Sequence, residues 1–235
     1  MASAPVLHIV KVRRAYNGLR PLRINDLSIG AGERVALSGI DAGAAEVLVN
    51  LVTGASVPDE GDVFVLGHST ASISDGDAWL ASLDRFGIVS PRAVWLDAAT
   101  LLQNLAMPLT LDIEPVKPDV AARVSQLARD VGIGGPWLEK PIAALDEAIR
   151  VRAHLARAIA LDPALLILEH PTAGLAAGEG KAFGETVARV TGARALTTLI
   201  ISEDAEFSAA AATRRLALHG ATGDLRPPRR KLFGF

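Results

Sequence analysis

Two short apolar runs constrain this chain more than any other feature of its sequence. LLILE at 165–169 and TLIIS at 198–202 are apolar at almost every position, with no alternation between polar and apolar residues. A strand that faces water on one side alternates, whereas a strand of a parallel sheet covered by helices on both faces does not. The two runs therefore predict an α/β fold with a mainly parallel sheet at its centre.

The rest of the chain supplies the other strands and helices of such a fold. Residues 1–90 carry strands separated by Gly and Asp turns, which predicts an antiparallel β subdomain, and residues 91–159 show helical periodicity. We therefore expect a core formed by 1–90 and 160–220, a helical subdomain at 91–159 and a tail at 221–235. Further strands are expected at 6–12, 34–38, 62–66, 86–90 and 214–219, and helices at 45–53, 98–107, 119–131, 146–161 and 179–191.

The composition excludes several classes of site and partner. The 235 residues are 50% hydrophobic, carry a formal net charge of −2 and include no cysteine. The lack of cysteine excludes disulfides and thiolate metal sites, and the weak net charge gives no case for a nucleic-acid partner. No apolar run approaches the roughly 18 residues of a membrane-spanning helix, and the N-terminal residues lack the order of a signal peptide. We expect a cytoplasmic protein without a bound metal.

One glycine-bearing turn has the position of a phosphate-binding loop but not its residues. SGIDAGAAEV at 38–47 follows the predicted strand 34–38 and leads into a predicted helix. In the pattern G-x-x-x-x-G-K-[ST], Gly39 takes the first position. Ala44, Ala45 and Glu46 then stand where the second glycine, the lysine and the hydroxyl residue are required.

The same turn carries carboxylates where a phosphate would bind. We expect Ala45 and Glu46 to begin the helix, with Glu46 or Asp41 near its free N–H groups, where the helix dipole favours negative charge. Gly43 lies between them. The loop is then either filled by its own anions or only a turn from strand to helix, and a triphosphate would meet like charges there.

Taken together, these segments resemble the nucleotide-binding subunit of ABC transporters, from about Leu7 to Gly220. The resemblance implies a P-loop NTPase-like fold with a RecA-like core, an antiparallel β subdomain and a helical subdomain. It is carried by LRINDLSIGAGERVALSG, VTGASVPDEGDVFVLG, TLLQNLAMPL, LDEAIRVRAHLARAIALDPALLILEHPTAGL and TTLIISED.

The resemblance also assigns roles to single positions, most of which carry a residue other than the family's. The positions are Tyr16 for the adenine-stacking aromatic, Pro91 for the Q-loop glutamine, Glu169 for the magnesium-linked aspartate, His170 for the catalytic glutamate, Ala176 for the D-loop aspartate, Glu203 for the switch histidine, and Leu145, Asp146, Glu147, Ala148 and Ile149 for the signature L-S-G-G-Q.

Both the phosphate loop and the partner-facing signature depart from the family pattern, which favours a non-hydrolysing pseudo-ATPase. Its expected role is that of a structural or regulatory partner of a transporter or ATPase complex, without a cofactor. The expected partners are a membrane-embedded transporter subunit or another ABC ATPase subunit, with a dimer as one arrangement. The protein would then lie at the inner face of the membrane through that partner.

Two other functions stay open. The first is an ABC transporter ATPase with altered catalytic residues, Glu169 and His170, which would bind ATP and Mg²⁺. The second is an enzyme of another kind on the same scaffold, which no Ser-His-Asp or metal-ligand cluster in the sequence supports. The end of the chain either touches an anionic membrane face or is a solvated end. The residues that would make the membrane contact are Arg226, Arg229, Arg230, Lys231, Leu232, Phe233 and Phe235.

Overall fold

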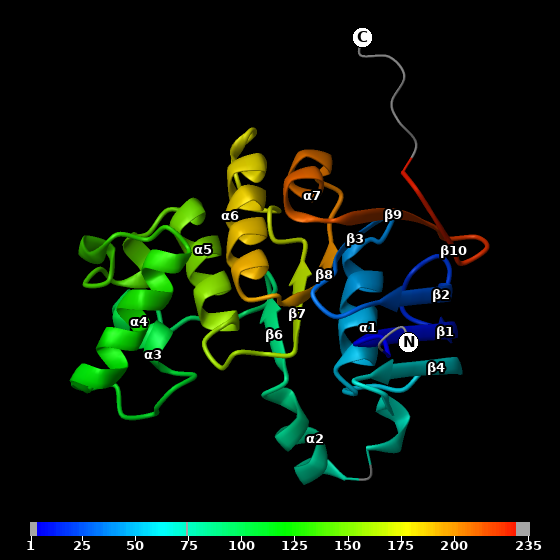
Figure 1. The fold of residues 1–235 in the computed structure, drawn as a ribbon, viewed down its shortest axis with the longest axis horizontal. Coiled ribbons are helices and arrows are strands. Elements are labelled where there is room, and N and C mark those ends of the chain that lie inside the picture. Colours follow the sequence, from blue (N-terminus) through cyan, green and yellow to red (C-terminus); the bar gives the residue numbers. More distant parts are fainter. Residues whose placement is uncertain (1–3, 74, 229–235) are drawn as a thin grey trace.

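The fold is known from a computed structural model, which describes residues 4–73 and 75–228. Figure 1 shows a sheet at the centre, helices to either side and a second sheet near the N-terminal end. The predicted membrane contact of the tail falls largely on residues 229–235, outside the described residues, so it stays a prediction.

The central sheet has six strands in the order β10-β9-β3-β8-β7-β6. All neighbouring pairs are parallel except β9 and β10. The segments 34–38, 165–169 and 198–202 lie in this one sheet, so the predicted fold class is confirmed. The strands are β3 (Arg34–Ser38), β6 (Phe86–Val89), β7 (Leu165–Glu169), β8 (Thr197–Ile201), β9 (Arg214–His219) and β10 (Asp224–Arg226).

Successive residues of the central strands enter two different hydrophobic cores. Leu165 and Ile167 of β7 belong to the cluster that includes α1 (Ala42–Val52), whereas Leu166 and Leu168 belong to the cluster under the other helices. All five residues of β7 are buried. Burial on both faces explains why this strand is apolar without alternation.

A four-stranded antiparallel sheet covers the α1 side of the molecule, in the order β2-β1-β4-β5. Its inward residues share one core with α1 and with the α1-facing residues of the central sheet. The predicted antiparallel sheet in the first third of the chain is therefore confirmed. Its strands are β1 (Leu7–Arg14), β2 (Leu22–Ile29), β4 (Glu60–Val65) and β5 (His68–Ser69).

The remaining elements are helical. In Figure 1 α3, α4 and α5 gather at one end of the molecule, beyond β6 and β7. None of the helices in the described ranges is long and apolar enough to cross a membrane. The domain boundaries at 91 and 159 stay a prediction. The α-helices are α2 (Gly76–Leu83), α3 (Leu101–Ala106), α4 (Pro118–Asp130), α5 (Glu147–Ala158), α6 (Glu179–Ala193) and α7 (Ala205–Ala211), and the 3₁₀ turns are η1 (Thr70–Ser72), η2 (Gly135–Trp137) and η3 (Ile142–Ala144).

Helix α2 differs from the other helices in how it is attached. None of the eight residues of α2, all of which the structure describes, has a buried side chain. The indole Nε1 of Trp79 donates a hydrogen bond of 3.0 Å to the carbonyl oxygen of Thr53, just after α1. The helix therefore rests on the body through partly exposed side chains rather than through a buried apolar face.

Candidate functional site

The turn between β3 and α1 is built around an aspartate cap. Asp41 is the N-cap of α1, and its Oδ1 accepts a hydrogen bond of 2.8 Å from the N–H of Ala44. The helix begins at Ala42, so the prediction that Ala45 and Glu46 begin it is wrong. The helix starts earlier than predicted because Asp41 is extended and its side chain accepts a hydrogen bond from an N–H group that the first turn leaves free. Of the two expected carboxylates, Asp41 is the one at the helix end, and Glu46 lies in the second turn.

Gly39 is required by the backbone of this turn. Its φ is +79°, and a Cβ placed there would lie 2.6 Å from the carbonyl oxygen of Leu218. A residue with a side chain would therefore meet both torsional strain and a clash with backbone. The chain keeps the tight strand-to-helix turn at this position.

A second carboxylate reaches the turn from the end of β8. The Oε1 of Glu203 accepts hydrogen bonds from the N–H groups of Gly39, at 2.7 Å, and Ile40, at 3.1 Å. Together with Ala44, three backbone donors of the turn point at carboxylates of the chain itself. Ala45, which the motif pattern sets at the lysine position, is fully buried against the α1-side core.

Tyr16 lies beside the same turn. Its hydroxyl donates a hydrogen bond of 3.1 Å to Oδ2 of Asp41, and a Cβ built on Gly43 would lie 3.1 Å from its ring. Burial, and then the hydrogen bond to Asp41, raises the pKa of Tyr16. Tyr16, Gly39, Asp41 and Ala44 share the lining of an open cavity of about 300 Å³. The structure thus brings the predicted aromatic residue to the predicted loop.

Arg92 connects two predicted site residues that carry like charges. Its Nη1 lies 2.8 Å from Oε1 of Glu46, and its Nη2 lies 2.8 Å from Oε2 of Glu169. The side chain of Glu169 is 3% exposed and that of Glu46 is 51% exposed. Sequence reasoning missed Arg92, although a cation directly after Pro91, at the end of a strand, could have been paired with the carboxylates expected there.

His170 directly follows β7, in a constrained backbone conformation. Its φ is +40°, and its backbone N–H donates a hydrogen bond of 2.8 Å to the carbonyl oxygen of Ile201. Its Nε2 is buried without a hydrogen-bond partner among the described residues. A small cavity of about 40 Å³ is lined by His170 together with Pro91, Glu147 and His154. The structure therefore gathers the predicted catalytic, Q-loop and signature positions around one point.

The signature segment begins α5 with a second aspartate cap. Oδ1 of Asp146 accepts 2.8 Å from the N–H of Ile149, while Leu145 is buried in the core. Glu147 lies in the first turn, 3.8 Å from Nη1 of Arg150. Ala148 follows Glu147 in the first turn of α5.

The remaining predicted position lies on a loop before α6. The N–H of Ala176 donates 2.9 Å to Oε2 of Glu179, so the loop is closed by a side chain of α6 itself. Among the described residues, no group of three or more His, Cys, Asp or Glu side chains is placed to hold a metal ion.

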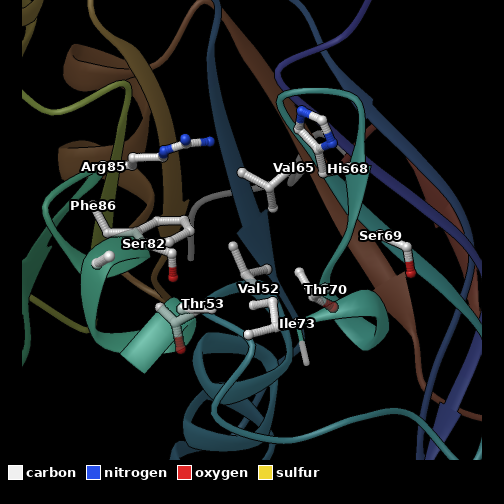
Figure 2. A pocket seen from close by; sticks show the side chains of 12 residues that line it. Val52, Thr53, Val65, His68, Ser69, Thr70, Ile73, Ser82, Arg85 and Phe86 are labelled. Atoms are coloured by element: carbon white, nitrogen blue, oxygen red, sulfur yellow. The ribbon is translucent and has the colours of Figure 1, made fainter. Parts of the chain in front are cut away.

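Another cavity, of about 190 Å³, lies away from all these positions. Figure 2 shows side chains from the end of α1, from β4 and β5, from the segment before α2 and from the start of β6 gathered around it. Val52, Val65, Ile73 and Phe86 form its apolar wall, and Arg85 and His68 stand beside it. None of the residues predicted from the sequence to form a site lines it.

The sequences of known proteins place the chain among transporter ATP-binding proteins. It is 31% identical over 212 residues to the lipoprotein-releasing system ATP-binding protein LolD of Alcanivorax borkumensis, covering 88% of this chain and 92% of that protein. It is 28% identical over 226 residues to the methionine import ATP-binding protein MetN of Brucella abortus, covering 96% of this chain and 60% of MetN. No protein-family model matches the chain.

Solved structures agree on the fold. The dimeric ATP-binding cassette MJ0796, bound to ADP and phosphate, superimposes with a TM-score of 0.76 at 19% identity, over 97% of this chain and 100% of that one. CbiO1 of Clostridium perfringens, part of the transporter complex CbiONQ, gives a TM-score of 0.78 at 18% identity, over 95% and 88%. The resemblance in sequence to LolD, over nearly the full length of both chains, shows that this chain belongs to the family of ABC transporter ATP-binding proteins.

Proposed function

We propose that this chain is a nucleotide-binding-domain subunit that does not hydrolyse ATP and serves as a structural or regulatory partner of a transporter or ATPase complex. One observation carries the proposal. The backbone donors of Gly39 and Ile40, at the turn where the family binds phosphate, already bind the carboxylate of Glu203. A nucleotide would have to displace this carboxylate before it could reach the same N–H groups.

The charges around the turn add to this cost. A triphosphate there would meet the carboxylates of Asp41 and Glu203, and each like-charge pair within several ångströms costs on the order of 2–4 kcal/mol at an effective surface dielectric. No cation at position 45 offsets this, because Ala45 is a buried apolar residue. Arg20 and Arg23 line the same cavity, but the N–H groups of Gly39 and Ile40 are taken by Glu203. We therefore propose that the chain has no nucleotide cofactor.

The relatives suggest which partners such a subunit would have. LolD is named for a lipoprotein-releasing system, CbiO1 is described as part of a transporter complex, and MJ0796 is described as a dimer. By this likeness the partner is a membrane-embedded transporter subunit or a second ATP-binding subunit. The chain would then work at the inner face of a membrane through that partner.

A second candidate function rests on His170. Its buried Nε2 has no hydrogen-bond partner among the described residues, and the chain's relatives are named as ATP-binding proteins. In this alternative the chain is an ATPase that binds ATP and Mg²⁺ and uses Glu169 and His170. The ion pair between Glu169 and Arg92 weighs against it, because that carboxylate is already engaged.

Binding of ATP with Mg²⁺ to the purified full-length chain tests the proposal directly. We expect no binding in calorimetry up to about 1 mM ATP, which corresponds to a binding free energy weaker than about −4 kcal/mol. We also expect no phosphate release above background, with or without a copurifying partner. Hydrolysis that His170→Ala abolishes would establish the ATPase instead.

A variant pair tests the observation that carries the proposal. Glu203→Ala removes the carboxylate from the N–H groups of Gly39 and Ile40, whereas Glu206→Ala removes an exposed carboxylate of the first turn of α7. We expect inorganic phosphate or ATP to bind Glu203→Ala more tightly than either the unaltered chain or Glu206→Ala. Tight ATP binding by the unaltered chain would contradict the proposal.

A further inference from the structure

Arg92 lies where the chain leaves the central sheet for the helices at the end of the molecule. It follows β6 by three residues, and its N–H donates 3.2 Å to Oγ of Ser90. The loop from residue 90 to residue 97 then leads toward α3. The side chain of Arg92 turns back and meets carboxylates from two other elements, α1 and β7.

The buried carboxylate in this group depends on the arginine. Glu169 is 3% exposed, and a buried charge is costly unless it is paired and hydrogen-bonded. Arg92 supplies both, because its Nη2 forms an ion pair and a hydrogen bond of 2.8 Å with Oε2. Its Nη1 forms an ion pair of 2.8 Å with Oε1 of Glu46, so one planar guanidinium bridges two carboxylates that would otherwise repel each other.

Glu46 and Glu169 occupy the two positions that the family resemblance assigns to residues that hold magnesium. We infer that the guanidinium of Arg92 takes the place of the divalent cation, as a counter-ion built into the chain. This inference rests on the proposed function and deepens it, because it says what holds the region together when no nucleotide and no metal is bound.

The far end of the same loop is held by a second set of contacts. Nε1 of Trp95 donates 2.9 Å to Nε2 of His154, and the guanidinium of Arg157 lies 4.1 Å from the Trp95 ring centre. Nη1 of Arg157 also donates 2.9 Å to the carbonyl oxygen of Val94. Burial and the charge of Arg157 lower the pKa of His154 to about 4, so the imidazole is neutral near pH 7 and can accept from the indole.

These contacts tie the loop to the sheet at one end and to α5 at the other without any ligand. We therefore expect that the position of the loop, which carries the exposed Val94 and Leu96, does not depend on nucleotide or metal. In a cassette that needed a bound cation to order this region, removal of the cation would loosen it. Here removal of Arg92 should do so at the end of the loop that meets the sheet.

Thermal unfolding of the full-length chain tests the inference. Arg92→Met should lower the melting temperature by about 5–10 °C, because it leaves the buried carboxylate of Glu169 without its ion-pair partner. The partial exposure of Arg92 keeps the effect below that of a fully buried pair. Arg92→Met combined with Glu169→Gln should recover at least half of that loss. Arg20→Met, at an exposed arginine, is the matched control and should shift the melting temperature by no more than about 2 °C.

The unaltered chain supplies the second readout. Its melting temperature should be the same in millimolar Mg²⁺ and in EDTA. With Trp79 and Trp137 replaced by Phe, the fluorescence of Trp95 should be equally accessible to acrylamide in both, and more accessible in Arg92→Met. A role in packing alone would not make the loss depend on the charge of Glu169.

Three results would overturn the inference. Arg92→Met could melt like the unaltered chain, the double variant could fall as far as the single one, or Mg²⁺ alone could stabilise the unaltered chain and EDTA reverse the effect. None of these depends on ATP hydrolysis. Failure of the inference can therefore be told apart from failure of the proposed function, which is decided by ATP binding and phosphate release.

Discussion

Helices α1 and α5 begin alike but differ in what surrounds them. Each starts after an aspartate whose Oδ1 accepts 2.8 Å from the N–H three residues on, Asp41 for α1 and Asp146 for α5. At α1 the neighbouring groups are also satisfied from within the chain, by Glu203 and by Tyr16. At α5 the next carboxylate, Glu147, has an arginine at 3.8 Å, beyond hydrogen-bond distance.

The difference separates the two helix ends that the family resemblance assigns to the phosphate loop and to the signature. The α1 end is exposed, but it is held by contacts that reach it from distant parts of the same chain. Among the described residues the α5 end is capped by the Asp146 side chain next to it, and Glu147 remains about half exposed. Changes at α1 should therefore lower the stability of the chain more than changes at α5.

The largest expected effect is at Gly39. Gly39→Ala should destabilise the chain by about 2–4 kcal/mol, because it adds strain at positive φ to a clash with the carbonyl of Leu218. Gly132→Ala is the control, at φ +82° with open space around it, and should cost about 1–2 kcal/mol. Urea unfolding measures both. Equal losses would mean that the turn before α1 is not closely packed.

The two aspartate caps test the comparison most directly. Asp41→Ala should cost about 2 kcal/mol, because it removes the cap and leaves the Tyr16 hydroxyl without its acceptor. Asp146→Ala should cost about 1 kcal/mol, the ordinary value for a lost cap. Urea unfolding of the two variants, measured side by side, gives the difference. A greater loss at Asp146 would break the comparison.

The glutamates that follow each cap should show a smaller contrast. Glu46→Gln weakens the ion pair with Arg92 and should cost roughly 0.5–1 kcal/mol, since both side chains are about half exposed. Glu147→Gln should leave stability within about 0.5 kcal/mol. Both free energies come from chemical unfolding. A loss at Glu147 as large as that at Glu46 would show that the α5 end is also held from within.

The smallest effect is spectroscopic. Tyr16 is the single tyrosine of the chain, so absorbance near 295 nm follows its ionisation alone. Because burial and Asp41 raise its pKa, the titration midpoint should lie above the ordinary value near 10, and Asp41→Asn should bring it down without restoring it fully. The stability linked to this raised pKa is fully present below pH 10 and is lost as the pH rises through the folded-state pKa. A midpoint unmoved by Asp41→Asn would exclude the hydrogen bond.

Much of the fold could be predicted from local patterns. The strands 34–38, 165–169 and 214–219 begin and end where they were expected, because each is a short apolar or β-branched run with clear ends. Strand β2 was not predicted, since Asn25 and Asp26 interrupt its alternation. Helices α2 and α7 are too short, at eight and seven residues, to show a helical period.

The site could be predicted less well than the fold. Asp41 as an anion at the start of α1 follows from local capping chemistry and was expected. The partners of Glu203 and Arg92 were not, because they lie 164 and 77 residues away along the chain. Glu46 was placed at the helix end by the motif frame alone, and the cap at Asp41 moved it into the second turn. Contacts of this kind depend on which strand ends meet, which sequence patterns do not record.

The loose attachment of α2 has a consequence for how quickly this part of the molecule opens. Amide protons exchange with solvent through local openings, whose free energy reflects the buried contacts that must be broken. An opening of α2 breaks the bond from Trp79 to Thr53 and exposes the wall of Val52 and Phe86, but it uncovers no buried side chain of the helix itself. Its amides should therefore exchange far sooner than those of β7, which exchange only when the whole domain unfolds.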